Sequence, residues 1–400
     1  MSTFKLLHVH PRRPPPCRRR AEPENREPRN LIRSRNGHKH HRDVCRRHRE
    51  VVVLNASRMS TTNEDHMTAD VNRNSVDTIE AQLASAIEAV KAKDRFANVY
   101  LVACGGSFAN MLPIEHLLET ETGRVAVHAL NAREFTTRMP KALGEHSLVI
   151  SCSHSGDTPE TVRATSVARE AGATTIALTN LGGSPLDEAA EFAIYYQHGE
   201  GRLYAYSASP LLYRLSWAII DELEGTEWSA RASAAAAELD GIVAQLQKEH
   251  GGPADVWAKA HRREALIYTL GSGPNYGQSY AFAICFLQEM LWVHSQAIHS
   301  AEYFHGPFEI TEDDVPFIEL LGLGPSREID QRAHDFVTRT SEHVLTLDAE
   351  EWDLSRIDAA LRPSYTQLVF GPLLRVYADA LSDHRGHPMT VRRYMWRTEY

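Results

Sequence analysis

The stretch SLVISCSHSGDTPETV, residues 147–162, joins a short apolar run to a cluster of small polar residues. The apolar run, 147–152, has the length and composition of a buried β-strand. Thr158 and Pro159 suit the N-cap and the first position of a helix, and Gly172 suits its end. The stretch therefore predicts a strand, a tight turn and a helix, which is the repeating unit of an open α/β sheet.

The turn between this strand and this helix, residues 153–156, is a candidate phosphate site. It offers backbone N–H groups at the positive end of a helix dipole, together with serine hydroxyls and an imidazole. Gly156 lets the backbone approach a ligand closely. Asp157 and Glu160 oppose this interpretation, because they repel a phosphate unless they turn away.

A second turn of the same kind, CGGSFAN (104–110), follows the apolar strand predicted at 98–104. Ser107 would open its helix. One such turn is more often only a helix cap, but two turns from neighbouring parallel strands could converge on one phosphate. The pair favours phosphate binding over simple capping.

Strands and helices alternate through the first half of the chain, which predicts a parallel sheet covered on both faces. The predicted helices are 75–93, 107–121 and 158–172, and the predicted strands are 98–104, 124–130, 147–152, 174–180 and 191–197.

The second half repeats this plan after a helical stretch at 205–250. The Gly/Ser turns lie 49 residues apart in the first half, from Cys104 to Ser153, and 51 residues apart in the second, from Gly271 to Gly322. An internal duplication explains both spacings. We therefore expect an α/β fold with two similar open sheets of about five strands each.

The first 58 residues differ in charge from the rest. Residues 1–58 carry 16 Lys/Arg and 5 Asp/Glu, a net charge of +11, while the remainder carries −20. Such a stretch lacks the apolar periodicity needed to fold. It could be a nucleic-acid-binding arm or a targeting peptide, or upstream sequence translated by mistake. Met59 precedes an ordinary polar N-terminus and favours the last interpretation.

The five cysteines indicate a reducing compartment. No pair has CxxC spacing, and Cys104, Cys152 and Cys285 lie in apolar runs, so we expect a cytoplasmic protein without disulfides or structural zinc. No apolar run reaches the roughly 20 residues of a membrane span. No metal-ligand cluster or dinucleotide fingerprint is visible, so no cofactor is expected.

Glu289 and His305 stand out in the second half. The run AFAICFLQEMLWV is apolar nearly all round, so the helix expected at 276–294 is buried or at a subunit contact. A carboxylate there is costly without a partner, which makes Glu289 a candidate general base or the partner of a cap or an arginine. His305 precedes Gly306-Pro307, a sharp turn that would aim its ring. A lone histidine is more often structural.

In these motifs and in its internal duplication, the chain resembles the SIS (sugar isomerase) domain family. CGGS followed 49 residues later by SHSGDT resembles its phosphosugar signature, and the duplication resembles its two-domain enzymes, such as the isomerase half of glucosamine-6-phosphate synthase. The runs LQEMLWVHSQAIHSAEYFHGPFEI (287–310) and RRYMWRTEY are most similar to fructoselysine-6-phosphate deglycases. The resemblance implies two tandem SIS domains, each a doubly wound, mostly parallel sheet. The expected parts are a disordered basic arm 1–58, a first domain 59–215, a helical linker 216–262, a second domain 263–385 and a C-terminal tail 386–400.

The resemblance also implies the roles of individual residues. Glu289 and His305 match the catalytic pair. The phosphate would be bound by four hydroxyls, with His154 helping: Ser107, Ser153, Ser155 and Thr158. Gly106 would contact substrate. Glu302, three residues before His305, would either orient substrate or pair with a partner subunit. We expect a homodimer with shared sites, in which the histidine reaches the partner's site, and no nucleic-acid or membrane partner.

The implied activity is hydrolysis of a 6-phosphorylated fructosamine to glucose 6-phosphate and an amine. Phosphosugar aldose–ketose isomerisation and glucosamine-6-phosphate deamination would use the same residues and stay open. So does a non-catalytic sugar-phosphate sensor, although no helix-turn-helix pattern precedes residue 75. Glutamine-dependent amide transfer would need a further catalytic domain, for which residues 1–74 are too short. The sequence does not identify the amine.

Overall fold

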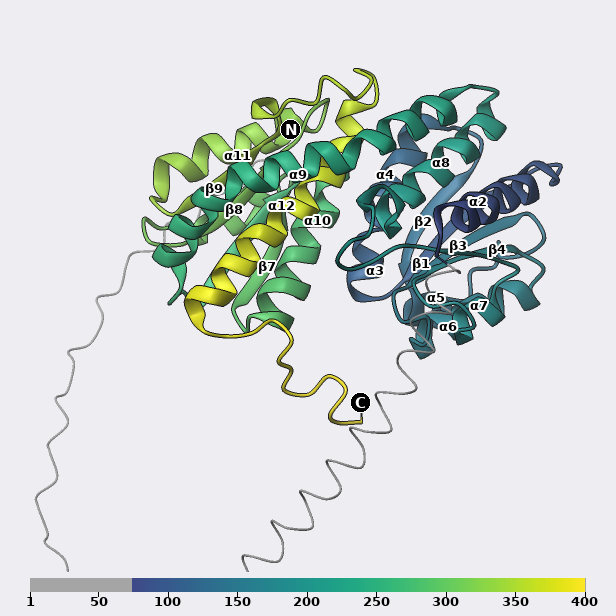
Figure 1. Cartoon of the computed structure of the whole chain (residues 1–400), viewed down its shortest axis with the longest axis horizontal. Helices are drawn as coiled ribbons and strands as arrows, with labels where there is room; N and C mark the ends of the chain where they lie inside the picture. The colour runs from purple at the N-terminus through teal and green to yellow at the C-terminus, as the bar shows by residue number, and fades with distance from the viewer. Residues whose placement is uncertain (1–73, 400) are drawn as a thin grey trace, which may run out of the picture. The chain divides into compact units, whose positions relative to one another are not determined.

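The computed structural model of the protein describes residues 74–399 (Figure 1). The basic arm expected at 1–58 lies outside the described residues. The described part begins just before α2 (Val76–Lys91), whose N-cap Ser75 accepts a hydrogen bond from the Thr78 backbone N–H. The SIS-domain boundaries expected from the sequence stay a prediction.

The first sheet has five parallel strands in the order β2-β1-β3-β4-β5. Their bounds are β1 (Asn98–Ala103), β2 (Ala126–Asn131), β3 (Ser147–Ser153), β4 (Thr174–Thr179) and β5 (Phe192–Tyr195). The chain order reverses between β1 and β3, and ligands of open α/β sheets bind at such a switch point, beyond the carboxyl ends of the strands. The two predicted phosphate turns follow β1 and β3, so the fold places them side by side.

Helices cover both faces of this sheet, as predicted from the alternation of strands and helices (Figure 1). Along β1, Val99 and Leu101 belong to the main core with α2 and the helices beside it, whereas Tyr100 and Val102 pack on the other face. The covering helices are α4 (Leu112–Glu121) and α8 (Ala208–Glu224) on one side, and α5 (Ala132–Arg138), α6 (Pro159–Glu170) and α7 (Pro185–Ala189) on the other.

The second sheet has four parallel strands in the order β7-β6-β8-β9. Its strands are β6 (Leu266–Gly271), β7 (His294–His299), β8 (Phe317–Leu321) and β9 (Val344–Asp348). The order matches β2-β1-β3-β4, so the duplication is confirmed, and β5 has no counterpart among the described residues. The two α/β sheets therefore hold five and four strands, against about five expected in each.

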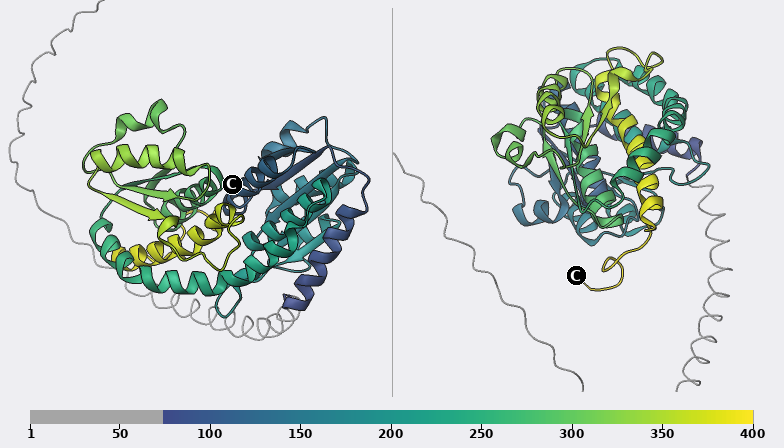
Figure 2. Two further views of the ribbon diagram at one scale, coloured as in Figure 1. Left: turned by 90° about the horizontal axis from the view of Figure 1, so that it is seen from above. Right: turned by 90° about the vertical axis from the view of Figure 1, so that its left-hand side faces the viewer.

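One long helix connects the two halves, and a second long helix packs against it. α9 (Trp228–His261) follows α8, and α12 (Arg362–Arg385) packs along it (Figure 2). α11 (Arg327–Thr340) covers the other face of the second sheet, where Ala333 and Val337 pack on Leu270 and Phe317. None of the described helices is long and apolar enough to cross a membrane.

The C-terminal end predicted for the helix at 276–294 is wrong. It consists of α10 (Tyr276–Ala281) and a π-helix, η3 (Phe282–Met290), and it stops before Trp292, whose φ is 56°. His294 already begins β7, which pairs with β6. The apolar run continues because β7 follows the helix directly, so hydrophobicity alone could not separate the two elements.

The remaining elements are short. α3 (Gly105–Ala109) lies at the first phosphate turn. The others are 3₁₀ turns: η1 (Tyr204–Tyr206), η2 (Gly273–Asn275), η4 (Tyr303–His305), η5 (Pro307–Ile310) and η6 (Ala349–Glu351).

Candidate active site

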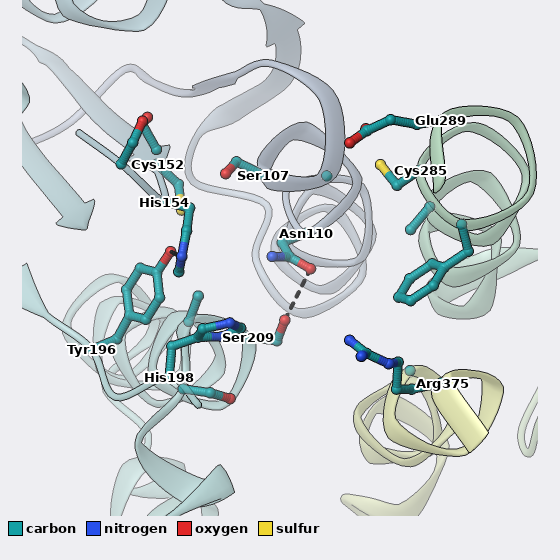
Figure 3. A pocket seen from close by; sticks show the side chains of 18 of the residues that line it. Ser107, Asn110, Cys152, His154, Tyr196, His198, Ser209, Cys285, Glu289 and Arg375 are labelled. Carbon is teal, nitrogen blue, oxygen red and sulfur yellow. Dashed lines mark hydrogen bonds between the residues drawn. The ribbon is translucent and has the colours of Figure 1, made fainter. Parts of the chain in front are cut away.

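A pocket of about 840 Å³ opens at the carboxyl ends of β1 and β3. Residues of the second half line it too, from α10, η3 and α12 (Figure 3). It gathers most of the residues expected from the sequence: Gly106, Ser107, Ser153, His154, Ser155, Thr158 and Glu289. Residues almost 200 positions apart in the sequence therefore form one site.

The first turn presents Ser107 within the short helix α3. Cys104 is the N-cap of α3, and Gly105 has a φ of 55°, which favours glycine. Ser107 hydrogen-bonds the thiol of Cys152 at the end of β3. Burial raises the pKa of the Cys152 thiol to about 12, so this cysteine is a neutral thiol rather than a nucleophile.

The second turn is fixed by its own hydroxyls. Ser153 Oγ and Thr158 Oγ1 are 2.9 Å apart, and the Gly156 N–H donates to Ser153 Oγ at 3.2 Å. Thr158 is the N-cap of α6 and Pro159 follows it, as predicted, although the Thr158 side chain makes no capping hydrogen bond. Ser153 and Thr158 are therefore positioned as a pair at the helix N-terminus, where an anion is favoured.

Only glycine fits at the centre of this turn. Gly156 has a φ of 69°, and a Cβ atom on it would lie 2.1 Å from Ser184 Oγ and 2.8 Å from Thr179 Oγ1. The turn therefore lies directly against the end of β4 and the N-cap of α7.

The two acidic residues near this turn behave differently. Ser155 Oγ donates a hydrogen bond to the Asp157 carboxylate, and both residues line the pocket. Glu160 is exposed and does not line it. A phosphate contact from the Ser155 hydroxyl therefore requires that its bond to Asp157 break.

His154 belongs to a small aromatic cluster. Its Nδ1 lies 2.9 Å from Tyr196 Oη, and its ring centroid lies 4.5 Å from that of His198. Loss of solvent around the ring lowers the pKa of His154, and the neighbouring His198 lowers it further. His154 is therefore suited to hydrogen bonding as a neutral imidazole more than to charge pairing.

Glu289 faces the pocket from η3, across from His154 (Figure 3). Its Oε1 accepts a hydrogen bond from Arg392 Nε at 2.9 Å and forms an ion pair with Arg392 Nη2, 2.8 Å away. An arginine partner was the alternative to a catalytic role, and the structure shows this partner at a carboxylate that also lines the pocket. π-helical segments are frequent at functional sites, which agrees with this position.

Arg392 comes from the C-terminal segment, residues 386–399. Its Nη1 donates to the carbonyls of Met389 and Val391, and its guanidinium lies 5.6 Å from the ring of Trp396. Trp396 also lines the pocket. No role was expected for this tail, although RRYMWRTEY was among the runs that carried the family resemblance.

Other lining residues had no clear signal in the sequence. Tyr196, His198 and Asn110 come from strand ends and short helices of the first half, and Arg375 comes from α12 (Figure 3). Asn110 Oδ1 accepts a hydrogen bond from Ser209 Oγ at 2.9 Å, which ties α3 to α8.

His305 and Glu302 do not line this pocket. Both are exposed at η4, which follows the edge strand β7. Gly306, with a φ of 139°, and Pro307 form the expected turn after His305. Within one chain the structure does not bring the predicted histidine to Glu289.

The equivalent turns of the second half are filled by the protein itself. A Cβ atom on Gly322 would lie 2.0 Å from Asn275 Nδ2, and one on Gly273 would lie 2.7 Å from Ser326 Cβ. Ser272 Oγ donates to the Ser326 carbonyl at 3.2 Å. These turns therefore lack the open cradle of the first half, and the pocket beside them, which Pro274 and Ser326 help to line, is smaller, about 260 Å³.

Known proteins share this two-sheet architecture and are similar to this chain in sequence. The SIS domain family matches residues 95–218. The chain is 42% identical over 303 residues to fructosamine deglycase FrlB of Bacillus subtilis (76% of this chain, 92% of that protein). It is 30% identical over 354 residues to the fructoselysine 6-phosphate deglycase of Escherichia coli K12 (84% and 99%). A solved B. subtilis structure, a candidate phosphosugar isomerase, aligns with a TM-score of 0.79 at 40% identity (80% and 97%).

The fold and these matches define a two-sheet SIS protein. The chain belongs to the SIS-domain family of phosphosugar enzymes. Within this family it is an enzyme of the deglycase branch, which confirms the resemblance seen in the sequence.

Proposed function

We propose that this enzyme cleaves a 6-phosphorylated fructosyl amine with water, giving glucose 6-phosphate and a free amine. One observation supports this most directly: the serine turns and Glu289 line the same pocket from opposite sides (Figure 3). A phosphosugar deglycase needs phosphate-binding groups at one end of the sugar and a base at the other. The similarity to fructosamine and fructoselysine 6-phosphate deglycases supports the same reaction class.

The serine turns would bind the phosphate. Ser107, Ser153 and Thr158 bring hydroxyls to the N-termini of α3 and α6, where backbone N–H groups and the α6 dipole favour an anion. Ser155 would join them by exchanging its bond to Asp157 for one to the phosphate. The phosphate-binding turns lie away from the reacting carbons, so the energy of phosphate binding orients the sugar.

Glu289 would act as the base. The substrate is a ketose with an amine on C1, and Glu289 would remove a proton from C1 to give an enaminol. Protonation at C2 then gives an imine between C1 and nitrogen. Water adds to C1 of the imine, and the C1–N bond breaks to release the amine and the aldehyde of glucose 6-phosphate. All atoms are supplied by substrate and water.

Arg392 would support this role of Glu289. A partly buried carboxylate is costly unless a cation compensates its charge, and Arg392 does so through a hydrogen bond from Nε and an ion pair at Nη2.

His305 would complete the site from a second subunit. It is exposed in one chain and lies outside the pocket, yet it matches the family's catalytic histidine. In a homodimer it would reach the partner's pocket and move protons at the sugar oxygens. The three described cysteines are free, which suits a cytoplasmic setting.

The proposal is tested with a panel of 6-phosphofructosyl amines, with glucose 6-phosphate and the released amine both quantified. We expect equal amounts of the two products and no turnover of the unphosphorylated substrates. Fructose 6-phosphate and glucosamine 6-phosphate are assayed in parallel. Faster turnover of either one than of every fructosyl amine would replace the deglycase assignment with isomerisation or deamination.

A further inference from the structure

The pocket contains a cationic side chain that has no role in the proposed phosphate binding or proton transfer. Arg375 projects from α12 into the pocket, on the far side from His154 (Figure 3). It follows Gly371 and Pro372 by about one helical turn, and these two residues also line the pocket. The cation is therefore carried by a helix that the site already uses.

The hydrogen bonds of Arg375 leave its outer edge free. Both come from Nε, to Asp379 Oδ1 at 3.0 Å and Asp379 Oδ2 at 2.9 Å. Within residues 74–399, neither Nη1 nor Nη2 of Arg375 has a hydrogen-bond partner. These two terminal groups form a planar fork that matches the two oxygens of a carboxylate.

The other arginine of the pocket has no such capacity. Arg392 uses Nε and Nη2 on Glu289, and Nη1 on the carbonyls of Met389 and Val391. His154 and His198 both have a lowered pKa, caused first by burial, and the positive charge of Arg375 contributes to the shift at His198. Among the described lining residues, Arg375 is thus the permanent cation with free donors.

The volume of the pocket agrees with a ligand larger than a hexose phosphate. About 840 Å³ lies towards the upper end of the range for small-molecule sites. With the phosphate at the serine turns and C1 at Glu289, the amine half of the substrate extends beyond C1. Arg375 and Glu289 both belong to the second half of the chain, opposite the serine turns.

We propose that Arg375 recognises a carboxylate on the amine half of the substrate, so that the enzyme prefers 6-phosphofructosyl amino acids to 6-phosphofructosyl derivatives of simple amines. This inference rests on the proposed function and assigns the specificity of the same site. Arg375 binds the carboxylate through Nη1 and Nη2, while Asp379 holds Nε and fixes the plane of the guanidinium.

The test compares two substrates that differ only by a carboxylate: the 6-phosphofructosyl derivatives of glycine and of methylamine. We expect wild-type kcat/KM to be roughly 10- to 100-fold higher for the glycine derivative, the size of a charge-assisted hydrogen-bonded contact. Arg375→Met should reduce this ratio at least tenfold, mainly through KM. Arg375→Lys should fall between the two, because it keeps the charge and loses the fork.

Arg263→Met is the matched control, because Arg263 is an exposed arginine outside the pocket; it should leave the ratio unchanged. Equal wild-type turnover of the two substrates, or a ratio that Arg375→Met does not change, would overturn the role of Arg375 and leave the deglycase function standing. Turnover of neither substrate, with isomerisation or deamination observed instead, would overturn both. Circular dichroism and thermal melting of each variant separate loss of recognition from loss of fold.

Discussion

Arg392 holds the carboxylate of Glu289 from 103 residues further along the chain, with Nη2 and Oε1 2.8 Å apart. The arginine side chain is 9% exposed and the glutamate side chain 25%. The pair joins the C-terminal segment to the π-helix η3 at the wall of the pocket. It links the position of the proposed base to the last residues of the chain.

Glu289→Gln should lower kcat by about 10²–10⁴-fold with little effect on substrate binding. The amide keeps the shape of the side chain and an oxygen that can accept from Arg392, but it cannot take a proton. Steady-state kinetics and calorimetric substrate binding check this. Glu119→Gln, on the exposed side of α4, is the control and should behave as the wild type. Near-normal kcat in Glu289→Gln would end the general-base proposal.

His305→Asn should also abolish turnover without altering the melting temperature, because His305 is exposed. If His305 reaches the partner's pocket, mixing this variant with Glu289→Gln should restore part of the activity. Mixed dimers would then hold one site with both residues intact. Activity is measured after subunit exchange has been demonstrated by mass spectrometry. No recovery in exchanged mixtures would contradict a shared site.

Ser153→Ala and Ser155→Ala should each raise KM by roughly 10- to 100-fold, since each removes a charge-assisted hydrogen bond of about 1.5–3 kcal/mol. Inorganic phosphate should inhibit the wild type competitively and both variants more weakly. Ser166→Ala serves as the control, because its hydroxyl bonds the Val162 carbonyl on α6, outside the pocket. Absence of competitive inhibition at high phosphate concentration would refute the phosphate assignment.

Gly156→Ala and Gly172→Ala form a matched pair that tests the second turn. Both glycines have positive φ, 69° and 88°, so each substitution should cost about 1–2 kcal/mol of backbone strain. At Gly172 the nearest atom would lie 3.7 Å from the new Cβ, whereas at Gly156 it would lie 2.1 Å away. Gly156→Ala should therefore lose about 1–3 kcal/mol more in urea unfolding and weaken phosphate inhibition. Equal losses would show that the turn has room to relax.

Asp330 should make stability depend on pH. Burial raises the pKa of Asp330 to about 6, and its Oδ1 accepts from Ser300 Oγ at 2.7 Å. The folded state therefore binds a proton more readily than the unfolded state, so this residue should lower stability as pH rises from about 4 to about 6, by about 3 kcal/mol in all. Asp330→Asn should flatten that part of the curve, while the exposed Asp335→Asn should not. Parallel curves for wild type and Asp330→Asn would contradict the raised pKa.

Local sequence was enough to predict the first sheet and its two turns. The strand 147–152, the N-cap Thr158 and Pro159 lie within a few residues of one another, and their chemistry acts locally. The position of the turns at one edge followed from the rule that parallel strands end together. By this rule Ser107 and Ser153 belong to one site, and both line the pocket.

Longer-range features could not be predicted in this way. The end of the helix before β7 was missed, because a buried helix and the strand after it form one apolar run. The repeat predicted turns in both halves. In the second half, Asn275 packs against Gly322 and fills the turn, and no local sequence pattern predicts this contact.

The sequence by itself thus determined the strand–turn–helix units, their duplication and the residues of the phosphate turns, since each depends on neighbours a few positions away. Only the tertiary structure decided which charges meet in the pocket. Arg392 reaches Glu289, and Arg375 enters the pocket with its outer donors free, because η3, α12 and the C-terminal segment pack together. Tertiary structure also left His305 outside the pocket of its own chain. Side-chain pairing across a hundred residues depends on the packing of whole helices, and helical periodicity fixes the face of a helix but not the partner of that face.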